Sequence, residues 1–313
     1  MSIRGKIFSF FTGMTQNINP FSNPDGIEKM KKMSLRYIDD KPPNNCTLKR
    51  YRTPSGAGYE VVQRKGKKSD KYIYYLHGGA YVTGLLSMYR SFAMGLSDNI
   101  SAVLLDYSLA PAYRYPMQLD EAYSVWNELT EKKGILPENI IIGGDSSGGN
   151  LVLALMLKLK DEGRKMPCGC FLLSAWTDML ASGRSYFDNY GKDVQMGEKN
   201  CVLTKGKHKQ LIESDLFCYL GNTDRKNPYV SPVYGEYKGF PPTFFSVGGD
   251  EMLLDDTLTV EKKMRKAGVS TVLEQQPEMF HTYILCMNSM PESKCSYQRL
   301  QKFVNDIFGQ RRD

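Results

Sequence analysis

The sequence contains no apolar run that approaches the length of a membrane span, which takes about 20 consecutive residues. Residues 7–11 follow Arg4 and Lys6 as a short, broken apolar patch. This patch is too short for the core of a signal peptide and has no small-residue cleavage site after it. We therefore expect neither a signal peptide nor a membrane-spanning helix.

Cysteines are few and irregular, and the seven of them follow no spacing typical of a disulfide scaffold. Cys168 and Cys170 are separated by a single residue, which does not fit a zinc site, and they lie in a stretch that predicts a buried strand. An odd number of unpatterned cysteines favours reduced thiols without a bound metal, and hence a cytoplasmic location.

The net charge is +7, but the basic residues are spread along the chain and their clusters at 64–68 and 205–209 are short. No nucleic-acid-binding motif accompanies them, so solvated loop faces are favoured over a nucleic-acid site. Internal repeats and low-complexity segments are absent as well. With 313 residues, 41% of them hydrophobic, the chain suits one large α/β domain with an insertion, or two small domains.

What the sequence does contain is an alternation of short apolar stretches, typical of buried strands, with longer helical stretches. Strands are expected at 47–64 (a pair), 71–76, 101–106, 140–142, 168–174, 243–247 and 271–275. Helices are expected at 118–132, 151–160, 255–267 and 294–308. Such an alternation predicts an α/β fold whose mostly parallel sheet is covered on both faces.

Two segments fall outside this alternation. Residues 1–45 predict two amphipathic helices, with Ile3, Ile7, Phe10 or Phe11, and Met14 on one face of the first. Such helices either lie on a membrane surface or pack on their own domain, and we expect the second. Residues 177–238 are rich in Gly, Asn, Tyr and charge, with helices expected near 207–219. We expect residues 46–313 to form one domain, with 177–238 inserted over the carboxyl ends of its strands.

The stretch 140–150, IIIGGDSSGGN, predicts a buried strand, a sharp turn and the start of a helix. Its turn contains a G-x-S-x-G motif, in which the serine stands on a strained turn and small residues two positions either side avoid a collision. The position two before Ser147 is Asp145 rather than glycine, so Ser146 is the candidate nucleophile.

A serine needs a base to take its proton, and the chain has only three histidines. His77 belongs to a glycine loop, and His208 sits in the basic stretch 205–209. His281 follows the last expected strand, where a loop at the edge of the sheet belongs. His281 is therefore the candidate base, by position and by elimination.

The acid of such a triad is expected between the serine and the histidine in the chain. Asp250 comes directly after the strand at 243–247 and is the candidate that would fix the histidine tautomer. Glu251, Asp255 and Asp256 are its rivals, although the last two are expected to begin the next helix, where carboxylates suit the helix dipole.

An oxyanion that forms on the substrate needs N–H donors aimed at it. Gly78 and Gly79 follow the strand at 71–76 and can offer their N–H groups without side-chain obstruction. Ser147, the residue after the nucleophile, offers a third. The alternative is that the sequence 77–79 forms only a tight turn.

Together, the segments 77–80 (HGGA), 144–148 (GDSSG) and 249–256 resemble the HGGG, GDSAG and D-P-L-x-D motifs of the hormone-sensitive-lipase-like family of α/β-hydrolase esterases. The resemblance covers about residues 71–290 and includes the Y-x-L-A-P segment at 107–111. It implies an eight-stranded, mostly parallel sheet, a helical cap and hydrolysis of carboxylic esters without a cofactor. Ala80, Ser147 and Glu251 depart from the family pattern, in which a glycine, an alanine and a proline stand at these positions.

The expected function is therefore that of a serine carboxylesterase acting on small short-acyl esters through Ser146, His281 and Asp250. An amidase, deacetylase or arylformamidase with the same triad is an alternative, as is a catalytically inactive relative that binds a small ligand. A lipase acting at a membrane or lipid droplet is a further option. The sequence does not decide whether the chain forms a homodimer, and it identifies neither the natural substrate nor the residues that line the pocket.

Overall fold

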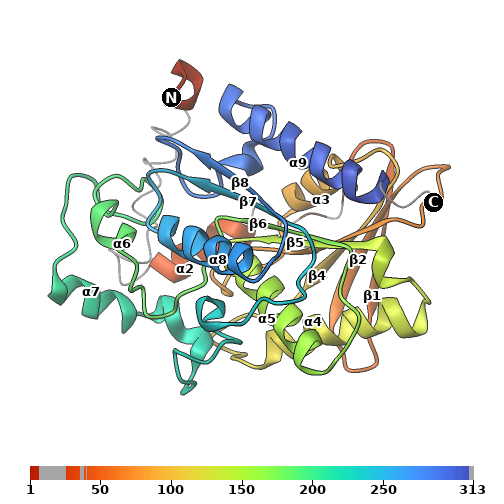
Figure 1. The fold of residues 1–313 in the computed structure, drawn as a ribbon, viewed down its shortest axis with the longest axis horizontal. Coiled ribbons are helices and arrows are strands. Elements are labelled where there is room, and N and C mark those ends of the chain that lie inside the picture. The colour runs from red at the N-terminus through yellow and green to blue at the C-terminus, as the bar shows by residue number, and fades with distance from the viewer. Residues whose placement is uncertain (7–25, 36–38, 40, 310–313) are drawn as a thin grey trace.

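A computed structural model describes residues 1–6, 26–35, 39 and 41–309. Its centre is an eight-stranded sheet with the strand order β1-β2-β4-β3-β5-β6-β7-β8 (Figure 1). The strands are β1 (Cys46–Arg52), β2 (Gly58–Arg64), β3 (Tyr72–Leu76), β4 (Ser101–Asp106), β5 (Ile140–Asp145), β6 (Gly169–Leu173), β7 (Thr243–Gly248) and β8 (Thr271–Gln276). The pairs β1–β2 and β2–β4 are antiparallel and the other pairs are parallel. The predicted mostly parallel, eight-stranded sheet is confirmed.

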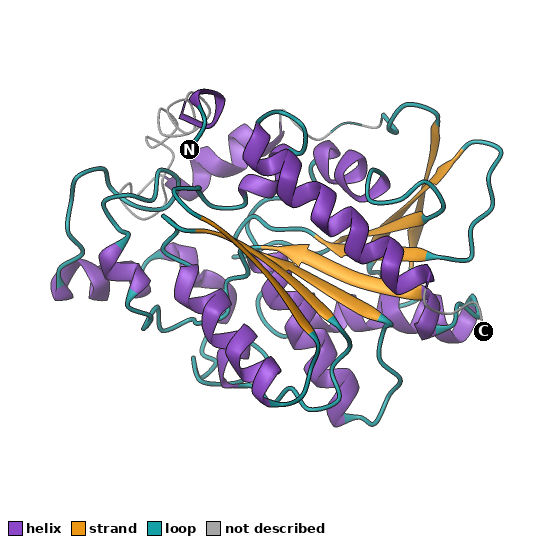
Figure 2. Ribbon diagram, turned by 45° about the horizontal axis from the view of Figure 1, so that its top comes forward, coloured by secondary structure: helices purple, strands orange, loops and turns teal. Residues whose placement is uncertain are grey.

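Helices cover both faces of the sheet (Figures 1 and 2). One face packs against α3 (Ser87–Met94) and α9 (Pro291–Gly309), and the other against α4 (Met117–Asn127), α5 (Ser147–Asp161) and α8 (Leu254–Lys266). Successive residues of a strand point to opposite faces. In β3, Ile73 and Tyr75 therefore join one core, whereas Tyr74 and Leu76 join the other. This is why the central strands are apolar at every position rather than at alternate ones.

All the strands expected from the sequence are present, with ends that shift by a few residues. The helix expected at 118–132 ends as an α-helix at Asn127 and continues as one wider turn, Glu128–Lys132. Helix α3 was not predicted. Leu86, at the capping position before this helix, provides no side-chain hydrogen bond, so this position carries no start signal for a helix.

The insertion between β6 and β7 contains short helices: α6 (Ser185–Asp188), α7 (Lys205–Ile212) and the 3-10 turns Asp215–Leu220 and Pro232–Tyr234. Before the sheet, α2 (Gly26–Ser34) forms the second of the two helices expected near the N-terminus. The residues that would carry most of the apolar face of the first helix, Ile7 to Met14, lie outside the described residues.

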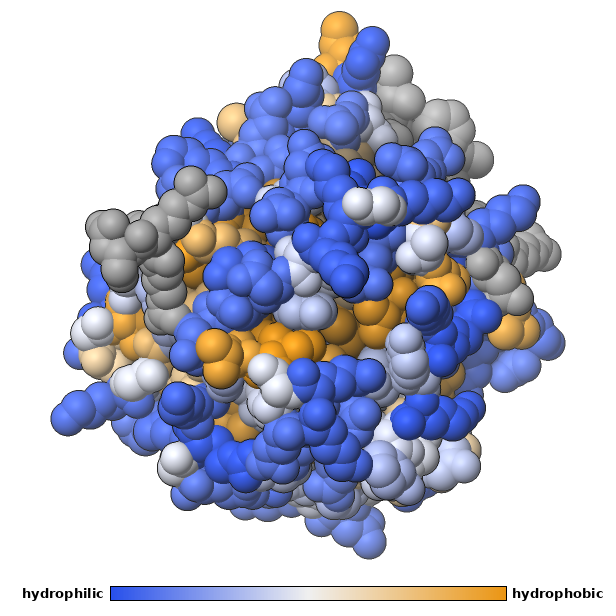
Figure 3. Space-filling view, turned by 90° about the vertical axis from the view of Figure 1, so that its right-hand side faces the viewer, coloured by the Kyte–Doolittle hydropathy of each residue, from blue (hydrophilic) through white to orange (hydrophobic). Residues whose placement is uncertain are grey.

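One end of the molecule is largely polar (Figure 3). The end of the molecule seen from the right-hand side of Figure 1 is covered mostly by hydrophilic side chains, with apolar ones visible in a furrow across it (Figure 3). Among the helices that the structure describes, none is both long and apolar enough to cross a membrane.

Candidate active site

Ser146 stands at the sharp turn between β5 and α5, as the sequence predicts. Its φ of 51° and ψ of −122° lie in a region that non-glycine residues rarely adopt. Three backbone hydrogen bonds hold it there: its N–H donates to the Leu173 carbonyl at 2.9 Å, and its own carbonyl accepts from the N–H groups of Trp176 at 3.0 Å and Asn150 at 3.2 Å. The strand next to β5 therefore stabilises a strained turn that presents the Ser146 side chain to a cavity.

The two glycines of the motif are required by space. A Cβ placed on Gly144 would lie 2.5 Å from the carbonyl oxygen of Leu76, and one on Gly148 would lie 2.1 Å from the same oxygen. Both contacts are with backbone, which cannot move aside without disturbing β3. The small residues expected on either side of the nucleophile are thus explained by the close passage of the chain after β3.

His281 lies in the loop after β8, and Glu251 is its acidic partner. Nδ1 of His281 donates to Oε2 of Glu251 at 2.9 Å, and both side chains are buried. The sequence-based assignment of Asp250 to this contact is therefore wrong by one residue. Glu251 was named among its rivals, and it stands where the resembling family has a proline.

The turn after β7 explains this difference. The Asp250 N–H donates to the Met279 carbonyl at 3.1 Å, and the Asp250 side chain is only half-buried. Burial raises the pKa of the Asp250 carboxyl, while the nearby Lys192 ammonium opposes that rise. The next residue, Glu251, turns its longer side chain inward beneath the end of β7. A motif places the acid in this turn, but only the backbone decides which of two adjacent carboxylates faces the histidine.

Glu251 is held by donors on all sides. Its Oε1 accepts a hydrogen bond from the Ser174 hydroxyl at 2.7 Å and another from the Gly248 N–H. Ser174 in turn accepts from the N–H of Thr282, next to His281, at 3.1 Å. Burial raises the pKa of Glu251, whereas the hydrogen bonds from His281, Ser174 and Gly248 oppose the rise. No sequence signal identifies Ser174 beyond its place at the end of a strand.

The charges around His281 favour its protonated form. Burial alone would lower the pKa of this imidazole, but the hydrogen bond and charge of Glu251 and the charges of Asp193 and Asp145 raise it above the ordinary histidine value. An imidazole in this setting is well suited to accept a proton and to hold it as a stabilised cation.

The glycine loop differs from the prediction at one residue. The Gly78 N–H donates to Oδ1 of Asp145 at 2.9 Å and is therefore not available to a substrate. Gly79 (φ 109°) and Ala80 (φ 52°) line the cavity instead. Within the described chain, neither of their N–H groups has an acceptor. Ser147 begins α5, and the first N–H groups of a helix have no partner within it.

Asp145 connects this loop to the nucleophile's strand. Besides the Gly78 N–H, it accepts the hydroxyl of Tyr75 at 2.7 Å and the hydroxyl of Tyr89 at 3.3 Å. Burial raises the pKa of Asp145 to about 6, although these hydrogen bonds and the nearby His281 lower it. The residue before Ser146 thus fixes the position of the loop that faces Ser146.

The other two histidines have structural contacts. The His77 ring stacks on Tyr107 with centroids 4.1 Å apart, and its Nδ1 lies 2.8 Å from the Gly78 carbonyl. Burial lowers the pKa of His77 to about 4, against the effect of that carbonyl, so the ring is neutral at pH 7. His208 stacks on Phe187, and its Nε2 lies 2.9 Å from the Ala181 carbonyl.

The cavity at Ser146 has a volume of about 590 Å³. Five methionines contribute to its lining: Met30 of α2, Met88, Met196, Met252 and Met287. Trp176, Leu216 and Phe217 add further apolar walls. Among the described lining residues, Asp145 is the only carboxylate and His281 the only imidazole. The space therefore favours an uncharged, mostly apolar molecule.

Aromatic residues at the start of the insertion contribute unevenly to the cavity. Tyr186 lines the cavity. Phe187 is exposed and stacks on His208, and Tyr190 is buried but does not line the cavity. Phe10, Phe11 and Met14 lie outside the described residues. In the part of the chain that the structure covers, no group of three or more His, Cys, Asp or Glu side chains is placed to hold a metal ion.

The chain is similar to known proteins over most of its length. The sequence model of a protein family with the α/β-hydrolase fold matches residues 73–285. These residues include Ser146, Glu251 and His281. The chain belongs to this α/β-hydrolase family. An acetyl-hydrolase of Streptomyces hygroscopicus is 28% identical over 249 residues, which are 79% of each chain. An esterase of Acinetobacter venetianus is 30% identical over 254 residues, which are 80% of each chain.

Among solved structures, this α/β-hydrolase is similar to an esterase of the bacterial hormone-sensitive lipase family, with a TM-score of 0.83 and 26% identity over 99% of each chain. It is also similar to the esterase EstE5, with a TM-score of 0.83 and 27% identity. The resemblance that the sequence motifs indicate is thereby confirmed. Two of the three motif positions that depart from the family pattern are at the site: Ala80 lines the cavity, and Glu251 contacts His281.

Proposed function

We propose that this α/β-hydrolase is a serine carboxylesterase that uses Ser146, His281 and Glu251 as its triad. The observation that carries the proposal is the Nδ1–Oε2 hydrogen bond of 2.9 Å from His281 to Glu251, beside a cavity that Ser146 also lines. The esterases and acetyl-hydrolase among its relatives support ester hydrolysis as the reaction.

Each group then has a role in an acyl-enzyme mechanism. Ser146 Oγ attacks the ester carbonyl carbon while Nε2 of His281 takes its proton. Glu251 holds Nδ1–H of His281, which fixes the tautomer and stabilises the imidazolium. His281 returns the proton to the leaving alcohol, and water then hydrolyses the acyl-enzyme with the same base.

The oxyanion would be bound by the N–H groups of Gly79, Ala80 and Ser147. The first two line the cavity, and the third lies at the N-terminus of α5 directly after Ser146. Such donors act most strongly where they are fixed in advance and shielded from water. Asp145 provides that fixation by holding Gly78, the residue before the two loop donors.

The substrate that we propose is an uncharged ester with a short acyl chain. The apolar lining supports an uncharged molecule, and the walls formed by Trp176 and Phe217 limit its length. One structural neighbour, EstE5, was soaked with p-nitrophenyl butyrate, an ester of this kind.

We expect kcat/KM for p-nitrophenyl esters to rise from acetate to about butyrate or hexanoate and then to fall steeply. Each added methylene that enters an apolar pocket contributes about 0.8 kcal/mol, or roughly fourfold, until the pocket is full and overpacking begins. Phe217→Ala removes part of the cavity wall and is expected to move the optimum to longer chains. Rates that keep rising through palmitate in the native protein would contradict a short-acyl pocket.

The rate is also expected to depend on the ionisation of His281, which must be neutral in the free enzyme to accept a proton. Its pKa is raised, so kcat/KM should fall as the pH drops through a value above the ordinary histidine pKa of about 6.5. The measurement is kcat/KM for p-nitrophenyl acetate between pH 5 and pH 9, with His208→Gln as a control that leaves the profile unchanged. A profile without this acid limb would remove His281 from the mechanism.

A reducing compartment such as the cytoplasm is the location that we propose. All seven cysteines are free thiols, and Cys46, Cys168 and Cys170 are buried in the core. Thiols of this kind persist where the surroundings keep cysteines reduced.

A further inference from the structure

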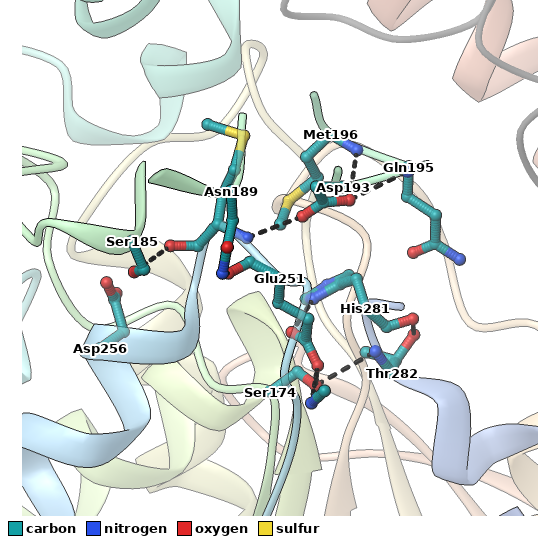
Figure 4. A network of polar contacts seen from close by, with 12 residues as sticks. Ser174, Ser185, Asn189, Asp193, Gln195, Met196, Glu251, Asp256, His281 and Thr282 are labelled. Carbon is teal, nitrogen blue, oxygen red and sulfur yellow. Dashed lines mark hydrogen bonds and ion pairs between the residues drawn. The ribbon is translucent and has the colours of Figure 1, made fainter. Parts of the chain in front are cut away.

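A segment of the insertion, residues 185–196, is joined by hydrogen bonds to the loop that carries Glu251 (Figure 4). We call residues 249–253, between β7 and α8, the acid loop. The buried amide of Asn189 donates to the carbonyl oxygens of Gly249 at 3.0 Å and of Glu251 at 2.9 Å. Ser185 adds a hydrogen bond of 2.7 Å from its hydroxyl to the Met252 carbonyl. The backbone on both sides of the Glu251 side chain is thus fixed from the insertion.

Asp193 forms the central connection. Its side chain is buried, with 1% of the residue exposed, and both carboxylate oxygens accept backbone hydrogen bonds. Oδ2 accepts the N–H of Met252, directly after Glu251, at 2.8 Å. Oδ1 accepts the N–H groups of Gln195 and Met196, each at 2.9 Å. Gln195, Met196 and Met252 all line the cavity, so one carboxylate fastens the acid loop to a wall of the pocket.

We propose that Asp193 is a positioning residue that holds Glu251 against His281 and at the same time fixes the pocket wall at Gln195 and Met196. The proposal rests on the proposed function, in which Glu251 is the acid of the triad. A carboxylate suits this role because it offers acceptors in two directions and carries no donor. The three backbone N–H groups around Asp193 all need an acceptor. A neutral side chain of the same size lacks the second acceptor oxygen and cannot satisfy all three.

The charge of Asp193 also reaches the site. The groups around His281 are Glu251 on the acid loop, Asp145 at the end of β5 and Asp193 on the insertion. Asp193 is therefore one of three acids that stabilise the imidazolium. Lys192 and Asp250 are further charged groups near the acid loop. Burial raises the pKa of the half-buried Asp250 carboxyl, and the Lys192 ammonium opposes that rise.

Asp193→Asn tests the proposal without a change of size. Asparagine keeps one acceptor but turns an NH₂ group toward N–H donors on one side, so either Met252 or the turn at Gln195 must move. Displacement of a supporting group by about 1 Å can cost on the order of a hundredfold in rate, and we expect a loss of that size in kcat for p-nitrophenyl acetate. Loss of the negative charge should also move the acid limb of kcat/KM to lower pH.

A double-mutant cycle with Glu251→Gln distinguishes positioning from a general structural role. If Asp193 acts through Glu251, most of the loss caused by Asp193→Asn should disappear when Glu251 is already replaced. Asp188→Asn, on the same segment, removes an exposed carboxylate that forms an ion pair with Arg184, away from the acid loop. It is the matched control, for which we expect no effect. Asn189→Ala loosens the same acid loop and should show the same dependence on Glu251, which keeps the test available if Asp193→Asn does not fold.

The inference is overturned if Asp193→Asn hydrolyses the ester like the native protein across the pH range. It is also overturned if the loss is the same factor with and without Glu251. A failure of the proposed function gives a different result, because the native protein and Ser146→Ala would then hydrolyse the ester equally slowly.

Discussion

Ser146→Ala is expected to reduce kcat on the order of a million-fold, as removal of the nucleophile does in a well-studied serine protease. The fold should remain, because alanine keeps the Cβ that Ser146 already places at φ 51° and changes no backbone hydrogen bond of the turn. Residual hydrolysis by the oxyanion donors alone would set the lower limit of the rate. The measurement is steady-state turnover of p-nitrophenyl butyrate, with circular dichroism to confirm the fold.

The matched control for this variant is Ser147→Ala. The Ser147 hydroxyl is buried; it accepts the Tyr81 N–H at 3.3 Å and also contacts the Tyr107 hydroxyl, so its loss removes hydrogen bonds that support the glycine loop. A hydrogen bond of this kind contributes about 1 kcal/mol, and we expect no more than about a tenfold decrease. If Ser147→Ala were inactive and Ser146→Ala active, the assignment of the nucleophile would have to move by one residue.

Glu251→Gln is expected to lower kcat roughly ten-thousand-fold, by analogy with the amide substitution of the buried acid in another serine triad. A glutamine can present its NH₂ to His281 and thereby favour the wrong tautomer, with Nδ1 as acceptor and Nε2 protonated. The imidazolium would also lose its counter-charge in a fully buried place, where such a charge is worth most.

Asp250→Asn is the comparison that decides between two adjacent acids. Because the Asp250 side chain is half-buried and its neighbour Lys192 lies on the insertion, we expect a change of less than about threefold in kcat, as for most substitutions away from the chemistry. Equal losses for the two variants would show that both carboxylates act on His281. A large loss for Asp250→Asn alone would restore the assignment made from the sequence motif.

The sequence could predict the elements whose signals are local. An apolar run before a glycine-rich turn identifies β5 and the elbow, and the elbow motif names Ser146 without knowledge of the rest of the fold. Helix α3 was missed because its stability depends on distant partners. Arg90, in the middle of this helix, is buried because distant groups accept hydrogen bonds from its guanidinium: Glu60 on β2, at 2.6 Å and 2.9 Å, and Asp39 and Lys41 before the sheet.

At the site, the limits have the same cause. His281 could be found because so few histidines are present, whereas the choice between Asp250 and Glu251 depends on how one turn directs two consecutive side chains. Gly78 was predicted as an oxyanion donor because the local sequence does not show that Asp145, 67 residues later, takes its N–H. The pocket could not be predicted, since its walls come from segments that meet only in the folded chain.

The hydrogen bonds from residues 185–196 to the acid loop also set a boundary for protein engineering. A chimera whose insertion between β6 and β7 comes from a relative without counterparts of Asn189 and Asp193 would leave the Gly249 and Glu251 carbonyls and the Met252 N–H without partners. The module that can be exchanged is therefore discontinuous in the chain: it consists of the insertion together with the loop from β7 to α8.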